Sequence, residues 1–259
     1  MKLVETETSG AVATITLVDE TRRNALSQQL LAELLEAIDA TERDPAVRVI
    51  VLTNRGSVFC AGANLTERSG QSGDVQSVVE LRELFERIMH SKKPFVGRIN
   101  GHCVAGGVGL AAVMDVSVAL NTAKFGFTEV RVGVAPAIIS VVCLPKMRRG
   151  DARAAFLRGG RFDAVEAARL GLINVAADAS SLDAEVDAIV ADLLAGAPHA
   201  IAAAKELTVV VPSMNDDEAF TWTSRLSRQL FESDEAHEGM SAFLEKRPAA
   251  WVDTSSTTE

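Results

Sequence analysis

The chain has 259 residues, of which 47% are hydrophobic and 24% are charged, and its formal net charge at pH 7 is −9. This composition is typical of a globular protein with one core, and the acidic balance argues against broad binding to nucleic acid or to an anionic membrane. Cys60, Cys103 and Cys143 lack metal-ligand spacing and are odd in number, so we expect a reducing, cytoplasmic setting. Residues 1–10 lack the apolar region of a signal peptide, and the apolar run 103–114 is too short to span a bilayer.

The first part of the chain is predicted to be rich in strands. Residues 3–8 and 11–18 flank Ser9-Gly10, which predicts a β-hairpin. Ser27 can cap a helix whose apolar residues recur at helical spacing until Asp44-Pro45 ends the pattern. These apolar residues are Leu30, Leu31, Leu34, Leu35 and Ile38.

Strands alternate with helices as far as about residue 177. The continuous apolar run 47–53 predicts a buried strand, and residues 94–99 and 116–120 predict two more. Residues 81–88 carry apolar side chains at helical spacing. The intervening residues 69–73 are rich in glycine and serine and predict a mobile surface loop.

From residue 180 onwards the pattern changes to four helices. The first covers about 186–194 and is ended by Gly196 and Pro198, and the second covers about 200–210. The third opens with Asp216-Asp217-Glu218, whose negative charges suit a helix N-terminus. The fourth lies between Ser233 and Pro248, and residues 254–259 form a polar tail. An all-helical end on an α/β core often packs against partner subunits, so we expect an oligomer.

Two glycine turns are the strongest chemical signals. Residues 59–65 read FCAGANL, residues 100–110 read NGHCVAGGVGL, and each follows a predicted buried strand by a short loop. The main-chain N–H groups at a strand-to-helix turn have no intrahelical partner, and the helix dipole adds positive charge there. Two such turns brought together would direct two N–H groups at one oxygen atom and stabilise an oxyanion. Tight turns and close packing alone are the competing interpretation.

A dinucleotide-binding fingerprint also occurs in this region. Residues 107–112 match G-x-G-x-x-A, and Glu129 lies at the right distance for a ribose contact. That fingerprint should begin at the end of the first strand of a βαβ unit, whereas here a hairpin and a helix precede it. The context therefore argues against a dinucleotide site.

Glu129 is the best candidate for a general acid and base. It lies in a segment with apolar neighbours, where a carboxylate is disfavoured and its pKa moves towards neutrality. The alternative is an ordinary surface glutamate, and Asp115 has the position of a structural carboxylate at a strand edge. The four histidines share no metal spacing, and G-x-S-x-G is absent, so neither a metal site nor a hydrolase serine is predicted.

Taken together, these segments resemble the enoyl-CoA hydratase/isomerase (crotonase) family along nearly the whole chain. The matching segments are 23–26, 59–65, 100–107, Phe125-Gly126 with Glu129, Gly133 with Pro136, and 238–247. The resemblance implies an α/β fold that is a crotonase-like spiral of ββα units. It also implies a spiral core over 1–195 with the acyl-CoA site, and a helical trimerisation region over 196–259. A homotrimer or a homohexamer, as a dimer of trimers, is the implied assembly.

The resemblance also implies roles for individual residues. The N–H groups of Ala63 and Gly106 would bind the thioester oxygen of an acyl-CoA, and Glu129 would manage the protons. No metal and no separate cofactor is implied, because coenzyme A is part of the substrate. The residues that would contact coenzyme A are Arg23, Ala25, Ala61, Asn64, Leu65, Phe243 and Lys246.

One departure from the family pattern affects the mechanism. Family hydratases with two catalytic glutamates carry one of them at the position of Gly109, so here Glu129 would act alone. The resemblance to a branch that includes methylglutaconyl-CoA-type hydratases, which manage with a similar glycine, favours hydration of a trans-2-enoyl-CoA. In that mechanism the N–H of Ala137 matches a position that helps to hold the water.

Two alternatives stay open beside hydration. The first is an enoyl-CoA isomerase in which Glu129 moves a proton between C2 and C4, and the second is a catalytically weak acyl-CoA-binding homo-oligomer. Acyl-chain recognition is assigned to residues 69–73, 81–89 and 141–144, whose side chains do not reveal the shape of a pocket.

Overall fold

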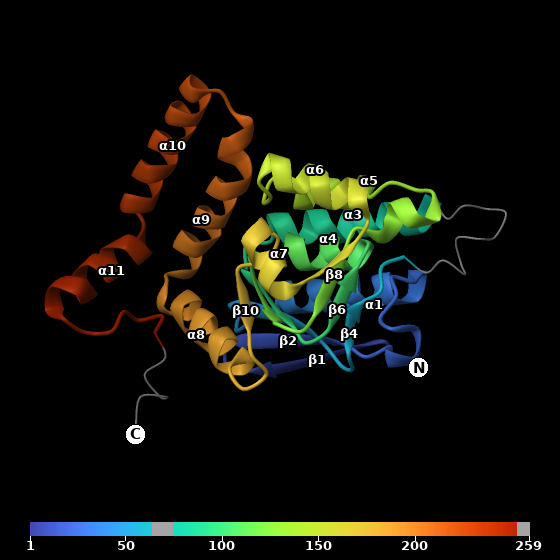
Figure 1. Cartoon of the computed structure of the whole chain (residues 1–259). Helices are drawn as coiled ribbons and strands as arrows, with labels where there is room; N and C mark the ends of the chain where they lie inside the picture. The colour runs from blue at the N-terminus through green and yellow to red at the C-terminus, as the bar shows by residue number, and fades with distance from the viewer. Residues whose placement is uncertain (64–74, 253–259) are drawn as a thin grey trace.

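Figure 1 shows the computed structural model of the chain, which describes residues 1–63 and 75–252, with side chains in the second range from residue 79. The predicted loop at 69–73 and the predicted tail at 254–259 lie outside the described residues. So do two of the residues predicted to contact coenzyme A, Asn64 and Leu65.

The larger of two sheets has the strand order β1-β2-β3-β5-β7-β10. Its strands are β1 (Val4–Ser9), β2 (Val12–Leu17), β3 (Val49–Asn54), β5 (Phe95–Ile99), β7 (Val116–Leu120) and β10 (Val175–Ala177). The predicted hairpin is confirmed, because β1 pairs antiparallel with β2, while the other neighbours pair in parallel.

The smaller sheet has the order β4-β6-β8-β9, and the sequence patterns did not predict it. Its strands are β4 (Val58–Cys60), β6 (His102–Val104), β8 (Lys124–Gly126) and β9 (Arg161–Asp163). Each has three residues, which is too short to display a period of two. Its first three strands are parallel, and β9 pairs antiparallel with β8.

The two sheets are connected by a repeating unit of two strands and a helix. β3 and β4 lead into α3 (Val75–His90), and β5 and β6 lead into α4 (Gly106–Val113). β7 and β8 lead into the 3₁₀ helix η2 (Thr128–Val132) and then α5 (Ala137–Cys143). Each unit places its first strand in the large sheet and its second strand in the small sheet. The predicted spiral of ββα units is therefore confirmed.

The large sheet is covered on both faces, which explains why every residue of β3 is buried. Ile50 and Leu52 belong to the core that contains the apolar stripe of α1 (Gln28–Arg43). Val49 and Val51, which point to the other face, pack with α8 (Leu182–Ala195). The helix start at Ser27 is as predicted, since its Oγ accepts a hydrogen bond from the Leu30 N–H at 3.2 Å.

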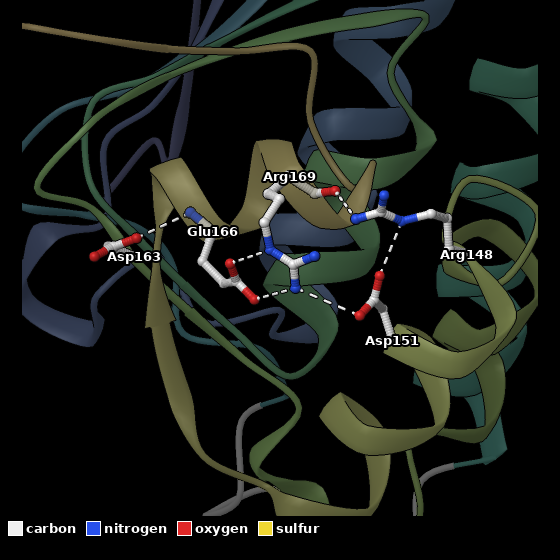
Figure 2. A network of polar contacts seen from close by, with 5 residues as sticks. All are labelled: Arg148, Asp151, Asp163, Glu166 and Arg169. Atoms are coloured by element: carbon white, nitrogen blue, oxygen red, sulfur yellow. Dashed lines mark hydrogen bonds and ion pairs between the residues drawn. The ribbon is translucent and has the colours of Figure 1, made fainter.

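Two further helices, α6 (Arg149–Arg158) and α7 (Ala164–Leu170), are joined by the polar network in Figure 2. Arg169 of α7 contacts Glu166 at 2.6 Å and Asp151 of α6 at 3.4 Å. Arg148 contacts Asp151 and donates to the carbonyl of Arg169, both at 2.9 Å. Asp163 caps α7 through the N–H of Glu166. The network thus connects α6 to α7 and to the last strand of the small sheet, β9.

The C-terminal arm comprises α9 (Pro198–Val210), η3 (Val211–Ser213), α10 (Asp216–Phe231) and α11 (Asp234–Glu245). With α8, these confirm the four predicted helices. Figure 1 shows α10 and α11 extending away from the sheets. α9 is anchored by Lys205, whose Nζ lies 2.7 Å from Asp115 Oδ2 and also donates to main-chain carbonyls. Asp115 thus has the structural role that its position at a strand edge predicts.

Among the helices of residues 1–63 and 75–252, no single helix is long and apolar enough to cross a membrane. Leu182–Ala195 and Pro198–Ser213 reach the necessary length and apolarity only together, and a bend of 109° separates them.

Candidate active site

The two glycine turns lie against each other. Gly62 has φ +81°, and a Cβ atom on it would lie 2.9 Å from the Gly106 nitrogen and 2.8 Å from the Val104 carbonyl oxygen. A Cβ atom on Gly106 would lie 3.8 Å from the Ala63 nitrogen. Side chains at these two positions would push the turns apart, so their glycines permit the close approach. The structure therefore places Ala63 and Gly106 next to each other, as the two-turn hypothesis requires.

Both N–H groups are free to bind an oxygen atom. Gly106 is the first residue of α4, so its N–H has no intrahelical acceptor. Among residues 1–63 and 75–252, neither the Gly106 N–H nor the Ala63 N–H finds a hydrogen-bond acceptor. The preceding residue, Ala105, has φ 49° and ψ −123°, an unusual backbone conformation for a residue with a side chain. Strained residues of this kind cluster at active sites and ligand-binding turns.

Close backbone packing holds the start of α4 against the small sheet. A Cβ atom on Gly107 would lie 2.2 Å from the Cys60 carbonyl oxygen, and one on Gly101 would lie 2.5 Å from the main chain of Ser57. Gly107 and Gly109 lie inside α4 rather than in a loop before it. The apparent dinucleotide fingerprint is therefore explained by helix packing.

The segment 23–26 runs beside the first turn. Ala61 N–H donates to the Arg23 carbonyl at 3.1 Å, and Leu26 N–H donates to the Gly62 carbonyl at 2.8 Å. Asn24, which is fully buried, donates from Nδ2 to the Val58 carbonyl at 2.8 Å. The structure thus brings together Arg23, Ala25 and Ala61, with the Arg23 side chain exposed to solvent.

Glu129 lies in η2 with one buried, unpaired oxygen atom. Its Oε2 is inaccessible to solvent and finds no hydrogen-bond partner among residues 1–63 and 75–252. Burial raises the pKa of this carboxyl group above its ordinary value, as the apolar flanks predict. The backbone around it is held in place, because the Glu129 carbonyl accepts from the N–H groups of Gly133 and Val134. In addition, Arg131 Nε donates to the Gly159 carbonyl at 2.7 Å at the end of α6.

The surroundings of Gly109 are apolar. A Cβ atom on Gly109 would lie 2.5 Å from Ile139 Cγ2 and 2.9 Å from Phe85 Cζ. Ile139 and Phe85 are themselves buried, with 3% and 4% of their surface exposed. The space that a glutamate side chain would enter at this position is already filled with hydrocarbon. The resemblance to the family had identified the missing carboxylate, but not the two side chains that occupy its place.

Three residues with a predicted role at the site, Ala137, Phe243 and Lys246, do not offer it within this single chain. The N–H of Ala137 donates to the Ala135 carbonyl at 2.8 Å, so it is already engaged and does not point to a water. Phe243 and Lys246 lie at the end of α11, which Figure 1 shows separated from β4 and α4 by α8 and α9. Phe243 is 83% exposed. Neither residue reaches the two turns of its own chain.

Other candidates have structural contacts instead. The Nδ1 of His102 accepts a hydrogen bond from the Lys124 N–H at 3.0 Å. Cys60, Cys103 and Cys143 are buried free thiols. Within the described part of the chain, no group of three or more His, Cys, Asp or Glu side chains is arranged to hold a metal ion.

Comparisons with known proteins find relatives of this chain over nearly its whole length. The family model for enoyl-CoA hydratase/isomerase matches residues 7–254. A relative from Thermus thermophilus is 36% identical over 244 residues, which are 92% of this chain and 96% of its own length. The (E)-benzylidenesuccinyl-CoA hydratase of Thauera aromatica is 30% identical over 252 residues, which are 96% of this chain and 98% of that protein.

Solved structures give the same result. The enoyl-CoA hydratase of Mycobacterium smegmatis superposes with a TM-score of 0.91 at 30% identity, covering 96% of this chain and 98% of that one. An enoyl-CoA hydratase from Shewanella pealeana has a TM-score of 0.90 at 27% identity, with 96% of each chain covered. The chain therefore belongs to the enoyl-CoA hydratase/isomerase family.

Proposed function

We propose that this protein is an enoyl-CoA hydratase that adds water across the 2,3 double bond of a trans-2-enoyl-CoA. The observation that carries this proposal is the contact between the two glycine turns. Within the described part of the chain, their N–H groups at Ala63 and Gly106 have no acceptor, and Glu129 has a buried carboxylate oxygen without a partner. Family membership and the names of the relatives support the same reaction.

In this mechanism, the thioester oxygen accepts hydrogen bonds from the N–H groups of Ala63 and Gly106. Addition of water at C3 moves negative charge onto that oxygen, so fixed donors stabilise the enolate-like transition state more than the ground state. The dipole of α4 adds to this effect at its N-terminus. A donor of this kind contributes about 3–4 kcal/mol in comparable sites.

Glu129 takes a proton from the attacking water and returns a proton to C2. Burial raises the pKa of Glu129, which makes its carboxylate a better proton acceptor than that of an exposed glutamate. The proton and the hydroxyl group of one water molecule are thereby both added to the substrate. The reaction needs no cofactor besides the coenzyme A of its own substrate.

An enoyl-CoA isomerase is the second candidate, and the surroundings of Gly109 favour it. Ile139 and Phe85 offer no polar atom to orient a water from that side. Moving a double bond from C3 to C2 requires only that Glu129 remove a proton from C2 and deliver one to C4, with no water added. The same oxyanion site would serve both reactions.

Coenzyme A recognition requires a second copy of the chain under this proposal. Arg23, Ala25 and Ala61 gather beside the first turn, whereas Phe243 and Lys246 are displayed on α11, away from it. Phe220, Phe231 and Phe243 are between 66% and 83% exposed on the arm. A homotrimer or homohexamer formed through the arm would cover these rings and could carry α11 to a neighbouring site.

A product assay tests the function. The chain is incubated with trans-2-enoyl-CoA and, separately, with 3-enoyl-CoA, and the products are identified by mass spectrometry. We expect 3-hydroxyacyl-CoA from the first substrate, while formation of the conjugated 2-enoyl-CoA from the second would favour the isomerase. Glu129→Gln is expected to lower kcat by about 10²–10⁴-fold with little change in binding.

The outcomes separate the three candidates. Saturable acyl-CoA binding without either product would indicate a binding protein and overturn the enzymatic proposal. Undiminished turnover by Glu129→Gln would remove this carboxyl group from the mechanism.

A further inference from the structure

A cavity of about 740 Å³ lies between the spiral core and the C-terminal arm. Its lining includes Met89 of α3, Val113 of α4, Val142 of α5 and Ile201 of α9. Apolar side chains predominate, and the ion-paired residues Lys205 and Asp115 also line the cavity. The proposed hydratase mechanism makes no use of this space.

The cavity begins one helical turn behind the apolar cluster around Gly109. Met89 follows Phe85 by four residues on α3, Val113 follows Gly109 by four on α4, and Val142 follows Ile139 by three on α5. Residues three or four apart lie on the same face of a helix, about 5.4 Å further along its axis. All three helices therefore run from the cluster to the cavity wall.

α4 also connects the cluster to the proposed thioester site. Gly106 and Gly109 are three residues apart, so the Gly106 N–H and the cluster lie about one helical turn apart. The Cβ direction of Gly106 is filled by Leu26 Cδ1 at 2.8 Å, so a ligand would approach the Gly106 N–H from the end of the helix. For an acyl chain that runs from there along α4, the next helical turn brings it to the cluster. There it meets Ile139 and Phe85, which fill the space over the Gly109 Cα atom.

We propose that Ile139 and Phe85 form a plug that ends the acyl pocket and separates it from the cavity, which makes them the residues that determine acyl-chain length. The plug gives the enzyme a preference for short hydrocarbon acyl groups. A glutamate at position 109 is excluded for the same reason, because its Cβ would overlap Ile139. This inference rests on the proposed function, since it concerns the acyl end of the same site.

The test measures kcat/KM for straight-chain trans-2-enoyl-CoA esters of four to twelve carbons in wild type, Ile139→Ala and Phe85→Ala. The wild-type profile is expected to peak at the short end. Each truncation should raise kcat/KM for the longer esters relative to the four-carbon ester by about tenfold or more, because added methylenes gain a hydrocarbon site. Ile139→Val is included as a mild variant that preserves the fold.

Val209→Ala is the matched control. Val209 lies on α9 and lines the same cavity, but it is absent from the closest contacts of Gly109. Its chain-length profile should equal that of wild type.

A second check is the substitution Gly109→Glu. Alone it should lower the free energy of unfolding strongly, and in combination with Ile139→Ala the loss should be smaller, as measured by urea unfolding.

The results distinguish the two proposals. A wild-type enzyme that turns over short esters but shows no shift in Ile139→Ala, Phe85→Ala or Ile139→Val overturns the plug and leaves the function intact. A wild-type preference for long esters also overturns the plug. A chain with no turnover and no acyl-CoA binding overturns the proposed function and the plug with it.

Discussion

The glycine-turn region and the C-terminal arm differ in where their packing partners come from. Around Gly62, Gly101 and Gly107, main chain packs on main chain at distances that leave no room for a Cβ atom. On α10 no residue is buried, and Phe220 and Phe231 are 73% and 66% exposed. One region is completed within a single chain, and the other displays apolar rings for which residues 1–63 and 75–252 provide no cover.

This difference assigns distinct physical roles to the two regions. Rigid backbone packing holds N–H groups at fixed positions, which is what oxyanion stabilisation requires. Exposed aromatic rings stabilise a protein only when they are buried against another surface. Large exposed apolar patches therefore mark sites of contact with partners. We expect that damage to the first region affects stability and turnover, whereas damage to the second affects assembly first.

The largest effect is expected from the arm. We expect the wild-type chain to form an oligomer through the arm, and Phe220→Ser combined with Phe231→Ser to give single chains at micromolar concentration, because buried aromatic residues dominate many interfaces. Light scattering measures the mass, and circular dichroism checks that the helices persist. Val79→Ser, at an exposed position on α3, is the control and should keep the wild-type mass. A wild-type chain that is already monomeric would contradict the role given to the arm.

The close packing at the glycine turns is tested by replacing a glycine with alanine, which adds one methyl group. Gly107→Ala would place its Cβ 2.2 Å from the Cys60 carbonyl oxygen, so we expect a loss of about 1–3 kcal/mol in the free energy of unfolding. Turnover should fall as well, because α4 must shift at Gly106. Gly150→Ala is the matched control in α6, where no heavy atom lies within 4 Å of the added Cβ. That change should stabilise the protein by up to about 1 kcal/mol. Equal effects of the two substitutions would exclude the packing argument.

A smaller effect concerns the pH dependence due to Glu129. Burial raises its pKa, so between its ordinary and raised pKa the folded state binds more protons than the unfolded state, and wild-type stability increases as pH falls. The cost of burying the charge is complete above the raised pKa and is absent below about pH 4.3, the ordinary value. Glu129→Gln should therefore be more stable than wild type at neutral pH.

Urea unfolding of both proteins from neutral pH down to about pH 4 measures this difference, since that range brackets the ordinary pKa of glutamate. The stability advantage of Glu129→Gln should shrink as pH falls. An advantage that is constant over the whole range would show that burial of charge is not its cause. In the wild type, kcat/KM should decrease as pH falls through the raised pKa, because the proton acceptor is lost.

The smallest effect is expected for the network in Figure 2. Arg169 is half exposed, and its partners Glu166 and Asp151 are 39% and 30% exposed, so water screens these ion pairs. Arg169→Ala should leave the urea midpoint and turnover nearly unchanged. A large loss of either would show that the network holds η2 and Glu129 in place.

Much of the fold was predictable because its signals are local. The hairpin at Ser9-Gly10, the cap at Ser27 and the arm helices follow from turn chemistry, capping and helical periodicity within short windows. The small sheet was not predictable, because β4, β6 and β8 have three residues each and pair only with strands far along the chain. Three residues are too few to show the alternation of apolar and polar side chains that marks a strand.

The amino-acid sequence by itself determined which groups are available for chemistry: two glycine turns, one carboxyl group in an apolar segment, and no second carboxylate at Gly109. Only the tertiary structure decided how they meet, with Ala63 beside Gly106, Glu129 partly desolvated, and Ile139 with Phe85 over Gly109. The physical reason is the separation along the chain over which each effect acts. Backbone conformation and periodicity act between near neighbours, whereas the burial of a charge or the filling of a gap depends on side chains that the fold brings from distant parts of the chain.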